Sequence, residues 1–232
     1  MNIHKIIFIG LALISAPFFV SGQQSKTYDL GNFERIAFYG RYTVEVHQSD
    51  SKELELTLHN SELDFSDLSM KYNDEELKVK FSGSLMDDQD LLMILRVPNI
   101  EHVEARQGCE LRFDQSFSFD HHPIELIVDS GGKIKASNIN SPFVKTKITK
   151  GGSIRVTGKT ELLDASIRTG GTIGAAQLKA TKVNASVTMG GEIICFPQQE
   201  LAAKVTTGGT INYKGDPTVD KKTRLGGTIE KL

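Results

Sequence analysis

The chain has 232 residues, of which 24% are charged and 39% hydrophobic, with no tryptophan and a formal net charge of −2. A net charge this close to zero gives no electrostatic bias toward nucleic acid, so a nucleic-acid partner is not expected. The length is sufficient for one sizeable hydrophobic core. Composition therefore predicts one globular body.

The first 22 residues have the pattern of a secretory signal peptide. A basic start, MNIHK, precedes the apolar run IIFIGLALISAPFFV and the small residues Val20-Ser21-Gly22. The run is shorter than the roughly 18 residues that span a membrane and contains Pro17, which disfavours a retained anchor. No cysteine follows it, so a lipoprotein anchor is not expected either. We expect a mature chain of residues 23–232 in the periplasm, on the outer surface or in the medium, with membrane contact only during export.

Residues 27–100 contain a series of strand-like segments. ERIAFYG, RYTVEVHQ, KELELTLHN, EELKVKFSG and LLMILRVPNI alternate or run apolar, and turn-rich stretches separate them. We interpret this region as irregular β-structure that begins the fold and blocks its open edge. No long helix is expected outside the signal peptide.

Residues 101–232 carry a repeat marked by adjacent glycines. Six pairs recur every 18 to 20 residues, and an isoleucine stands three places after the first glycine of every pair. Positions seven, five and three before it are mostly apolar or small, and polar residues separate them, as in a half-buried strand. The pairs are Gly131-Gly132, Gly151-Gly152, Gly170-Gly171, Gly190-Gly191, Gly208-Gly209 and Gly226-Gly227.

This pattern predicts an all-β fold, a parallel β-solenoid with Gly-Gly corners. Each coil would hold a strand, the corner, a second short strand with the isoleucine, and a less regular return such as NINSP or CFPQQ. Coils stack about 4.8 Å apart, and a residue without Cβ can take a positive φ and lets neighbouring backbones approach. Six unrelated hairpin turns of a sandwich would not keep columns in register on both sides of each pair.

The two ends of the array differ from its middle. EARQGCELRF is interpreted as a worn first copy, with Gly108 as first glycine, Cys109 in place of the second and Leu111 in the isoleucine column. In the last coil, Lys221 and Thr223 occupy core columns, as expected where a solenoid must face water.

The order of these segments resembles a known family. Strands of the form RYTVEVHQSDSKELELTL and ELKVKF, then LRVPNIEHVEARQGCEL, then Gly-rich coils, are similar to the bacterial head-GIN domain family, described as putative auto-transporter adhesin and common in Bacteroidetes. The resemblance implies a right-handed β-helical fold and an envelope or exported location. It brings no catalytic residues. This chain uses plain Gly-Gly where the family often has a Gly-Ser-Gly type of corner.

The outward columns beside the corners supply the candidate ligand face. Threonine dominates them, which is first of all the composition of a solvated strand face. As a binding surface they would offer a flat array of hydroxyl and cationic groups. The candidate residues are Lys133, Arg168, Thr172, Thr188, Thr206, Thr210 and Arg224.

No catalytic, cofactor or metal site is predicted. Asp87, Asp88 and Asp90 share a polar loop, but no glutamate follows at EF-hand spacing, and His121 and His122, as neighbours on a strand, would point to opposite faces. We therefore expect a non-enzymatic surface or periplasmic interaction module whose partner is a glycan or an envelope protein. The alternatives are a β-helical carbohydrate-active enzyme and a purely architectural envelope component.

Overall fold

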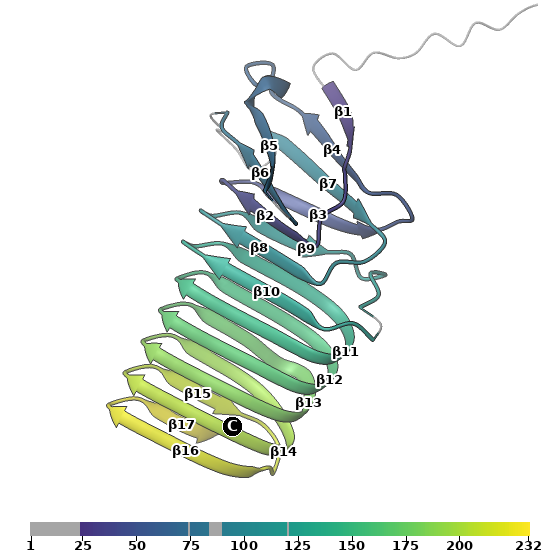
Figure 1. Ribbon diagram of the computed structural model, residues 1–232. Helices are drawn as coiled ribbons and strands as arrows, with labels where there is room; N and C mark the ends of the chain where they lie inside the picture. The colour runs from purple at the N-terminus through teal and green to yellow at the C-terminus, as the bar shows by residue number, and fades with distance from the viewer. Residues whose placement is uncertain (1–23, 74, 84–89, 120) are drawn as a thin grey trace, which may run out of the picture.

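A computed structural model describes residues 24–73, 75–83, 90–119 and 121–232, so the predicted signal peptide and the Asp87-Asp88 pair lie outside the described residues. The described residues form a 17-stranded sheet wound into a solenoid, with the first strands at one end and the C-terminus at the other (Figure 1). The predicted fold class, an all-β solenoid, is confirmed. Among the described residues, no helix has the length and apolar character to cross a membrane.

The strands fall into a short N-terminal set and a longer C-terminal set. The first set is β1 (Gln24–Asp29), β2 (Arg35–Tyr39), β3 (Thr43–Gln48), β4 (Glu53–Leu58), β5 (Leu68–Asn73), β6 (Glu76–Phe81) and β7 (Leu91–Val97), with a 3-10 turn η1 (Phe65–Asp67) before β5. The second set is β8 (His102–Arg106), β9 (Glu110–Phe113), β10 (Ile124–Asp129), β11 (Lys133–Lys150), β12 (Ser153–Thr169), β13 (Thr172–Met189), β14 (Glu192–Thr207), β15 (Thr210–Tyr213), β16 (Thr218–Leu225) and β17 (Thr228–Lys231).

Three parallel ladders run along the solenoid axis. The first ladder stacks β6, β2, β8 and β10 on the C-terminal ends of β11 to β14 and on β16. The second ladder stacks β7, β3 and β9 on the N-terminal ends of β11 to β14 and on β15 and β17. The third ladder joins the middle segments of β11 to β14. In the repeat region the chain passes from the first to the second ladder across a Gly-Gly corner.

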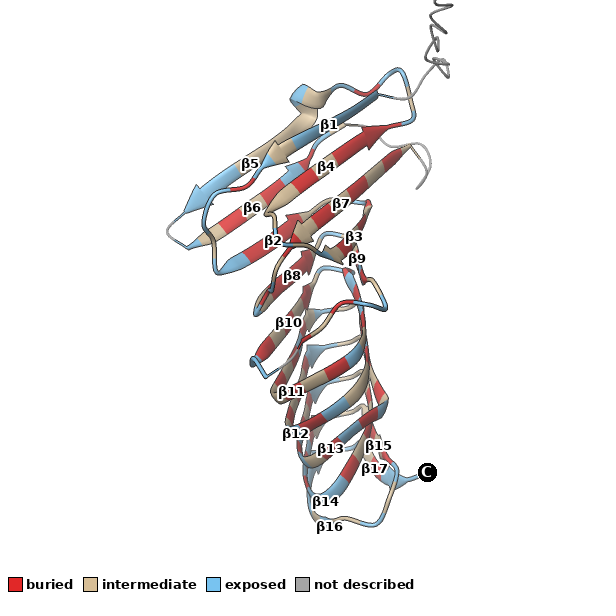
Figure 2. Cartoon of the chain, turned by 90° about the vertical axis from the view of Figure 1, so that its right-hand side faces the viewer, coloured by how far each residue is buried: buried red, intermediate tan, exposed pale blue. Residues whose placement is uncertain are grey.

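The strand register places the residues of each sequence column opposite one another on successive coils. Ile134, Ile154, Ile173, Ile193, Ile211 and Ile229 are consecutive partners in the second ladder. In the first ladder, Ile124 pairs with Val144, and Val144 with Leu163. These side chains are buried in one continuous core, and Figure 2 shows buried and exposed positions alternating along the strands. Period-two patterning thus places apolar residues inside each coil and polar residues outside.

The return of each coil is more regular than the sequence suggested. NINSP (138–142) lies within β11 and CFPQQ (195–199) within β14, so both are strand rather than irregular structure. The bend is made by register shifts, one of them between Ala136 and Ile139, and by residues with positive φ, Asn138 at +58° and Gly158 at +126°. The irregular composition therefore marks β-bulges, which bend a strand without ending it.

The N-terminal cap extends the ladders and then closes them with antiparallel strands. β2 and β3 stack directly on β8 and β9, and β6 and β7 stack on the other side of them. β5 then pairs antiparallel with β6, while β4 and β1 continue antiparallel from β7. The sequence alignment did not identify the β2–β3 coil, because its corner has a single glycine, Gly40. In addition, Val44, which pairs with Leu111, stands four places after that glycine, one place later than the isoleucine of the repeats.

Among the described residues, the third ladder does not extend beyond β11 toward the N-terminal end, and aromatic side chains pack beside β9 instead. Phe117 and Phe119, in the segment between β9 and β10, cluster with Phe113 of β9 at ring-centroid distances of 4.9 to 5.2 Å. All three are buried. This segment is hydrogen-bonded to the coils on both sides: Asp114 N donates to Val46 O of β3 (2.9 Å), and His121 N donates to Asn140 O of β11 (3.2 Å).

Candidate functional site

The Gly-Gly corners are the most regular feature of the surface. From Gly151-Gly152 to Gly226-Gly227, the first glycine has φ between +61° and +73° and the second between +102° and +105°. The first N–H donates to a carbonyl of the next coil, as from Gly151 N to Thr169 O (2.9 Å). The second carbonyl accepts from the next coil, as Gly152 O does from Thr172 N (3.0 Å). Hydrogen bonding is therefore continuous around the bend.

The two glycines of a pair are needed for different reasons. A Cβ on Gly151 would meet nothing within 4 Å, whereas one on Gly152 would lie 2.3 Å from Gly132 O and 2.6 Å from Val128 Cγ1. The first position requires only a left-handed backbone, and the second also requires the absence of a side chain.

The first corner is built differently. At Asp129–Gly132 the positive φ values belong to Ser130 (+52°) and Gly131 (+83°), and Gly132 N donates to Asp129 O (3.3 Å). This is the φ pattern of a type I′ turn. Gln107 (+56°) and Gly108 (+89°) repeat it one coil earlier, and the position after them carries the buried side chain of Cys109.

The structure places the candidate ligand residues in two outward columns that flank the corners. Arg168, Thr188, Thr206 and Arg224 precede the corners in β12, β13, β14 and β16, and Lys133, Thr172 and Thr210 follow them in β11, β13 and β15. Lys133, Thr172 and Thr210 share one register column with Ser153, Glu192 and Thr228. We call these two columns, with the exposed residue immediately before each glycine pair, the corner face.

Two apolar side chains on the corner face were missed from the sequence. Met189 and Leu225 lie immediately before glycine pairs and are 56% and 74% exposed. In the register, Thr207 lies between them. Both residues were visible in the sequence one place before a glycine pair, but an alternating pattern does not show that this position faces solvent. Interfaces are enriched in Met and Arg, so the mixture resembles a docking surface.

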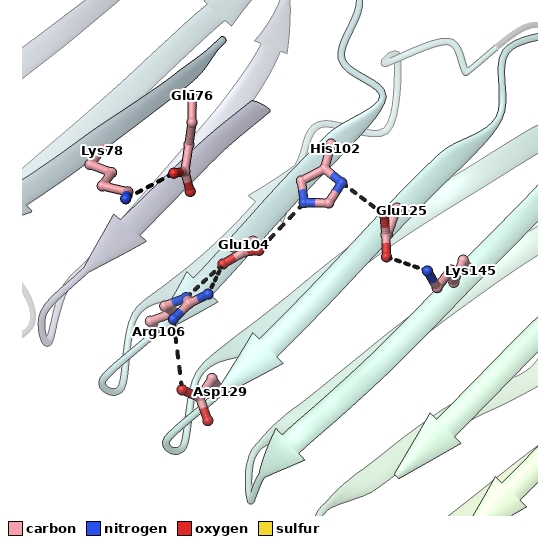
Figure 3. A network of polar contacts seen from close by, with 8 residues as sticks. All are labelled: Glu76, Lys78, His102, Glu104, Arg106, Glu125, Asp129 and Lys145. Carbon is pink, nitrogen blue, oxygen red and sulfur yellow. Dashed lines mark hydrogen bonds and ion pairs between the residues drawn. The ribbon is translucent and has the colours of Figure 1, made fainter. Parts of the chain in front are cut away.

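A polar network occupies the outward surface of β8 and β10, in the upper coils (Figure 3). Glu104, which is 8% exposed, accepts a hydrogen bond from Arg106 Nε (2.6 Å) and lies 3.4 Å from His102 Nε2. His102 Nδ1 lies 2.8 Å from Glu125, which also pairs with Lys145 Nζ at 2.8 Å. Sequence reasoning missed this network because its members come from three strands.

The carboxylates of this network are held in their charged form. Burial alone would raise the pKa of Glu104, but the hydrogen bonds from His102 and Arg106 outweigh it and lower the pKa. For Glu125, burial is likewise outweighed by Lys145 and His102, and its pKa is lowered. A glycosidase needs one carboxyl group with a raised pKa to act as general acid. Neither of these groups has that property.

A second charged cluster lies on the other side of the corner. Glu110 of β9 pairs with Arg112 (2.7 Å) and Lys135 (2.8 Å), with Lys133 at 3.8 Å. Burial raises the pKa of Glu110, but the bonds from Arg112 and Lys135 lower it, to about 2 overall. Lys133, one of the candidate ligand residues, therefore belongs to a charge cluster in addition to the corner face.

A cavity of about 280 Å³ borders the polar network. Its lining includes Arg35, Glu101, His102, Glu125 and Lys145. Glu125 is ion-paired, as above, and Glu101 lies 3.4 Å from His122 Nδ1. Within the described ranges, no three His, Cys, Asp or Glu side chains are grouped so that they could hold a metal ion.

The two cysteines are buried free thiols. Cys109 lies at the β8–β9 corner, and Cys195 faces inward in β14 opposite Tyr213. Four second-ladder steps separate their coils, roughly 19 Å at about 4.8 Å each, well beyond the approximately 7 Å between bridged Cα atoms. Burial raises the pKa of Cys195 to about 12, so its thiol is unreactive.

The family is shown by a match over residues 32–217 to the model described as "Putative auto-transporter adhesin, head GIN domain". The chain belongs to this family. No curated protein matches the sequence.

Solved structures share the fold at low sequence identity. A putative adhesin from Bacteroides fragilis has a TM-score of 0.79 and 16% identity, over 91% of this chain and 98% of that one. A putative adhesin from Parabacteroides merdae has a TM-score of 0.68 and 20% identity, over 92% and 97%. A structure from Parabacteroides distasonis titled putative lipid binding protein has a TM-score of 0.71 and 17% identity, over 92% and 98%.

Proposed function

We propose that this head-GIN domain protein is an exported, non-enzymatic, adhesin-like binding module whose corner face docks a partner on a cell envelope. The single observation that carries the proposal is the composition of that face. Exposed Met189 and Leu225 stand beside Arg168 and Arg224, on a backbone held by continuous corner hydrogen bonds. Such a surface loses little conformational entropy on binding, because its backbone is already ordered.

Membership of a family described as adhesins supports this reading. Export is proposed from the signal-like start of the sequence, and fractionation of the native host tests it: the protein should be in the periplasmic, surface or medium fraction with residues 1–22 removed. Full-length protein in the cytoplasm would contradict export.

The absence of catalysis is proposed from the charge state of the outward carboxylates. Glu104, Glu110 and Glu125 all have lowered pKa values because each is bonded to cations. We expect no release of reducing ends in a screen of polysaccharides. A reproducible activity lost on substitution of one Asp or Glu, with the circular dichroism spectrum unchanged, would overturn this expectation.

Docking on the corner face is tested by binding of the purified mature chain to envelope fractions. The double variant Arg168→Ala/Met189→Ala should lose at least about tenfold in affinity, since central Arg and large apolar side chains carry most interface energy. Lys71→Ala, an exposed change on β5 of the cap, is the matched control. Equal binding by the parent and the double variant would exclude the corner face as the docking surface.

A further inference from the structure

A groove of about 370 Å³ lies on the third ladder, where the notable feature is a pair of lysines on adjacent coils. Lys159 of β12 and Lys179 of β13 are direct partners in the register, both are exposed, and both line the groove. Its other lining residues are His121, Asn140, Ser141, Pro142, Thr160, Glu161, Thr181 and Gln198.

Cations also lie opposite each other at Lys71 and Lys78, at Lys135 with both Arg112 and Arg155, and at Lys204 and Lys222, but in each of these pairs at least one cation is ion-paired to an acid. Four pairs of register partners with opposite charge form ion pairs between coils: Glu125 with Lys145 (2.8 Å), Lys182 with Glu200 (2.9 Å), Glu110 with Lys133 (3.8 Å) and Arg106 with Asp129 (4.0 Å). Like charges placed directly opposite each other destabilise a sheet. Among the described residues, neither Lys159 nor Lys179 has an acidic partner within 4.0 Å.

The rest of the groove defines the chemistry of a ligand. Glu161 lies beside the lysines without forming an ion pair to them within the described chain, so the three groups carry one net positive charge. Thr181 and Gln198 add a hydroxyl and an amide. No large apolar side chain lines the groove, which disfavours an acyl chain or an apolar peptide. The volume is within the usual range of small-ligand sites.

We propose that this groove binds an acidic sugar, with the carboxylate of a uronic-acid unit between Lys159 and Lys179. The sugar hydroxyls then bond to Glu161, Thr181 and Gln198. A single negative charge fits because Glu161 repels a more highly charged group such as a phosphate dianion, whereas it accepts hydrogen bonds from hydroxyls. The site lies on a different ladder from the corner face, so this inference does not rest on the proposed function.

The proposal also explains why two lysines stand opposite each other with no acidic partner for either among the described residues. Their repulsion costs stability in the empty protein and is relieved when an anion lies between them, a trade of stability for binding that functional sites often show. Lys179→Gln should therefore leave the melting temperature of the ligand-free protein unchanged or slightly raised at low salt. A lysine with a structural role would instead lower the melting temperature when replaced.

The test is a titration of the mature chain with tri-galacturonate, followed by calorimetry, against the neutral galactose trisaccharide. We expect binding of the acidic sugar alone, weakened by salt, and about tenfold weaker in Lys159→Gln and in Lys179→Gln. Lys182→Gln, which removes a nearby cation already paired with Glu200, should bind as the parent does. Equal affinity for both sugars would overturn the proposal, and so would undiminished binding by the Lys159 and Lys179 variants or tighter binding of inorganic phosphate than of tri-galacturonate.

Discussion

The N-terminal cap and the regular coils build the same two ladders from different kinds of sequence. In the coils, one corner, one isoleucine column and small or β-branched core residues recur on each turn. In the cap, strands that are not consecutive in the chain become neighbours, as when β2 pairs with both β6 and β8. The coils therefore depend on local repetition, and the cap on contacts between distant segments.

The charges follow the same division. Residues 24–100 contain 8 Lys and Arg against 15 Asp and Glu, whereas residues 101–232 contain 18 against 14. At the junction between the cap and the regular coils, acidic side chains from β8 to β10 are ion-paired to cations. The outward columns of the lower coils instead carry mainly hydroxyl groups and have fewer ion pairs. The surface of the junction is thus held by specific ion pairs, whereas the surface of the lower coils carries more exposed hydroxyl groups and fewer ion pairs.

The largest effect is expected from a substitution that interrupts the repeated corners of the coils. Gly152→Val should destabilise the chain by about 3 to 5 kcal/mol, because a β-branched residue is strained at φ +105° and its Cβ would clash with Gly132 O. Gly151→Asn should cost less than about 1 kcal/mol, since asparagine tolerates the left-handed region and meets no neighbour. Urea unfolding measures both. Similar losses for the two variants would contradict the division of roles within the pair.

The next prediction concerns the aromatic side of the upper coils. Phe117→Ala should destabilise by about 3 kcal/mol, because it removes a ring that is 1% exposed and packs against Phe113 and Phe119. Phe117→Leu should retain most of the stability, since it keeps most of the buried volume. Thermal and urea unfolding measure the difference. An alanine variant as stable as the parent would show that the cluster does not support the junction.

A smaller and opposite effect is expected inside the coils. Thr146 is fully buried between Leu126 and Ala165 in the first ladder, and its hydroxyl has no hydrogen-bond partner among the described residues. Thr146→Val should therefore stabilise the chain by about 1 kcal/mol, since it replaces an unsatisfied hydroxyl by a methyl group of similar size. Thr146→Ser, which keeps the hydroxyl and removes a methyl, is the matched comparison and should destabilise. A valine variant less stable than the parent would imply that the hydroxyl is bonded in solution.

The smallest effect is the acid response of the junction. Because the folded pKa of Glu110, about 2, lies below its ordinary value of 4.5, its contribution to stability is present above pH 4.5 and is lost as the pH falls toward 2. Glu110→Gln should remove this part of the acid sensitivity and lower stability at neutral pH. Urea midpoints between pH 2 and 7 measure it, with Glu161→Gln as a control carboxylate outside any ion pair in the described chain. A variant that keeps the parent's full pH dependence would assign the effect to other carboxylates.

The sequence by itself determined the repeat, the inward columns and the place of each corner, because a period of 18 to 20 residues stacks like residues on one another and exposes the pattern to simple alignment. Only the tertiary structure decided which strands of the cap are neighbours, since β2 and β3 pair on both sides with segments that follow them at different distances along the chain. The tertiary structure also decided the polar network, whose charged residues come from three strands. It likewise decided that Lys159 and Lys179 are neighbours, because they lie 20 residues apart in the returns of two adjacent coils, where composition alone predicted irregular structure. Local periodicity specifies what a residue does within its own coil, whereas the meeting of side chains from different coils depends on bulges and register shifts that no single segment encodes.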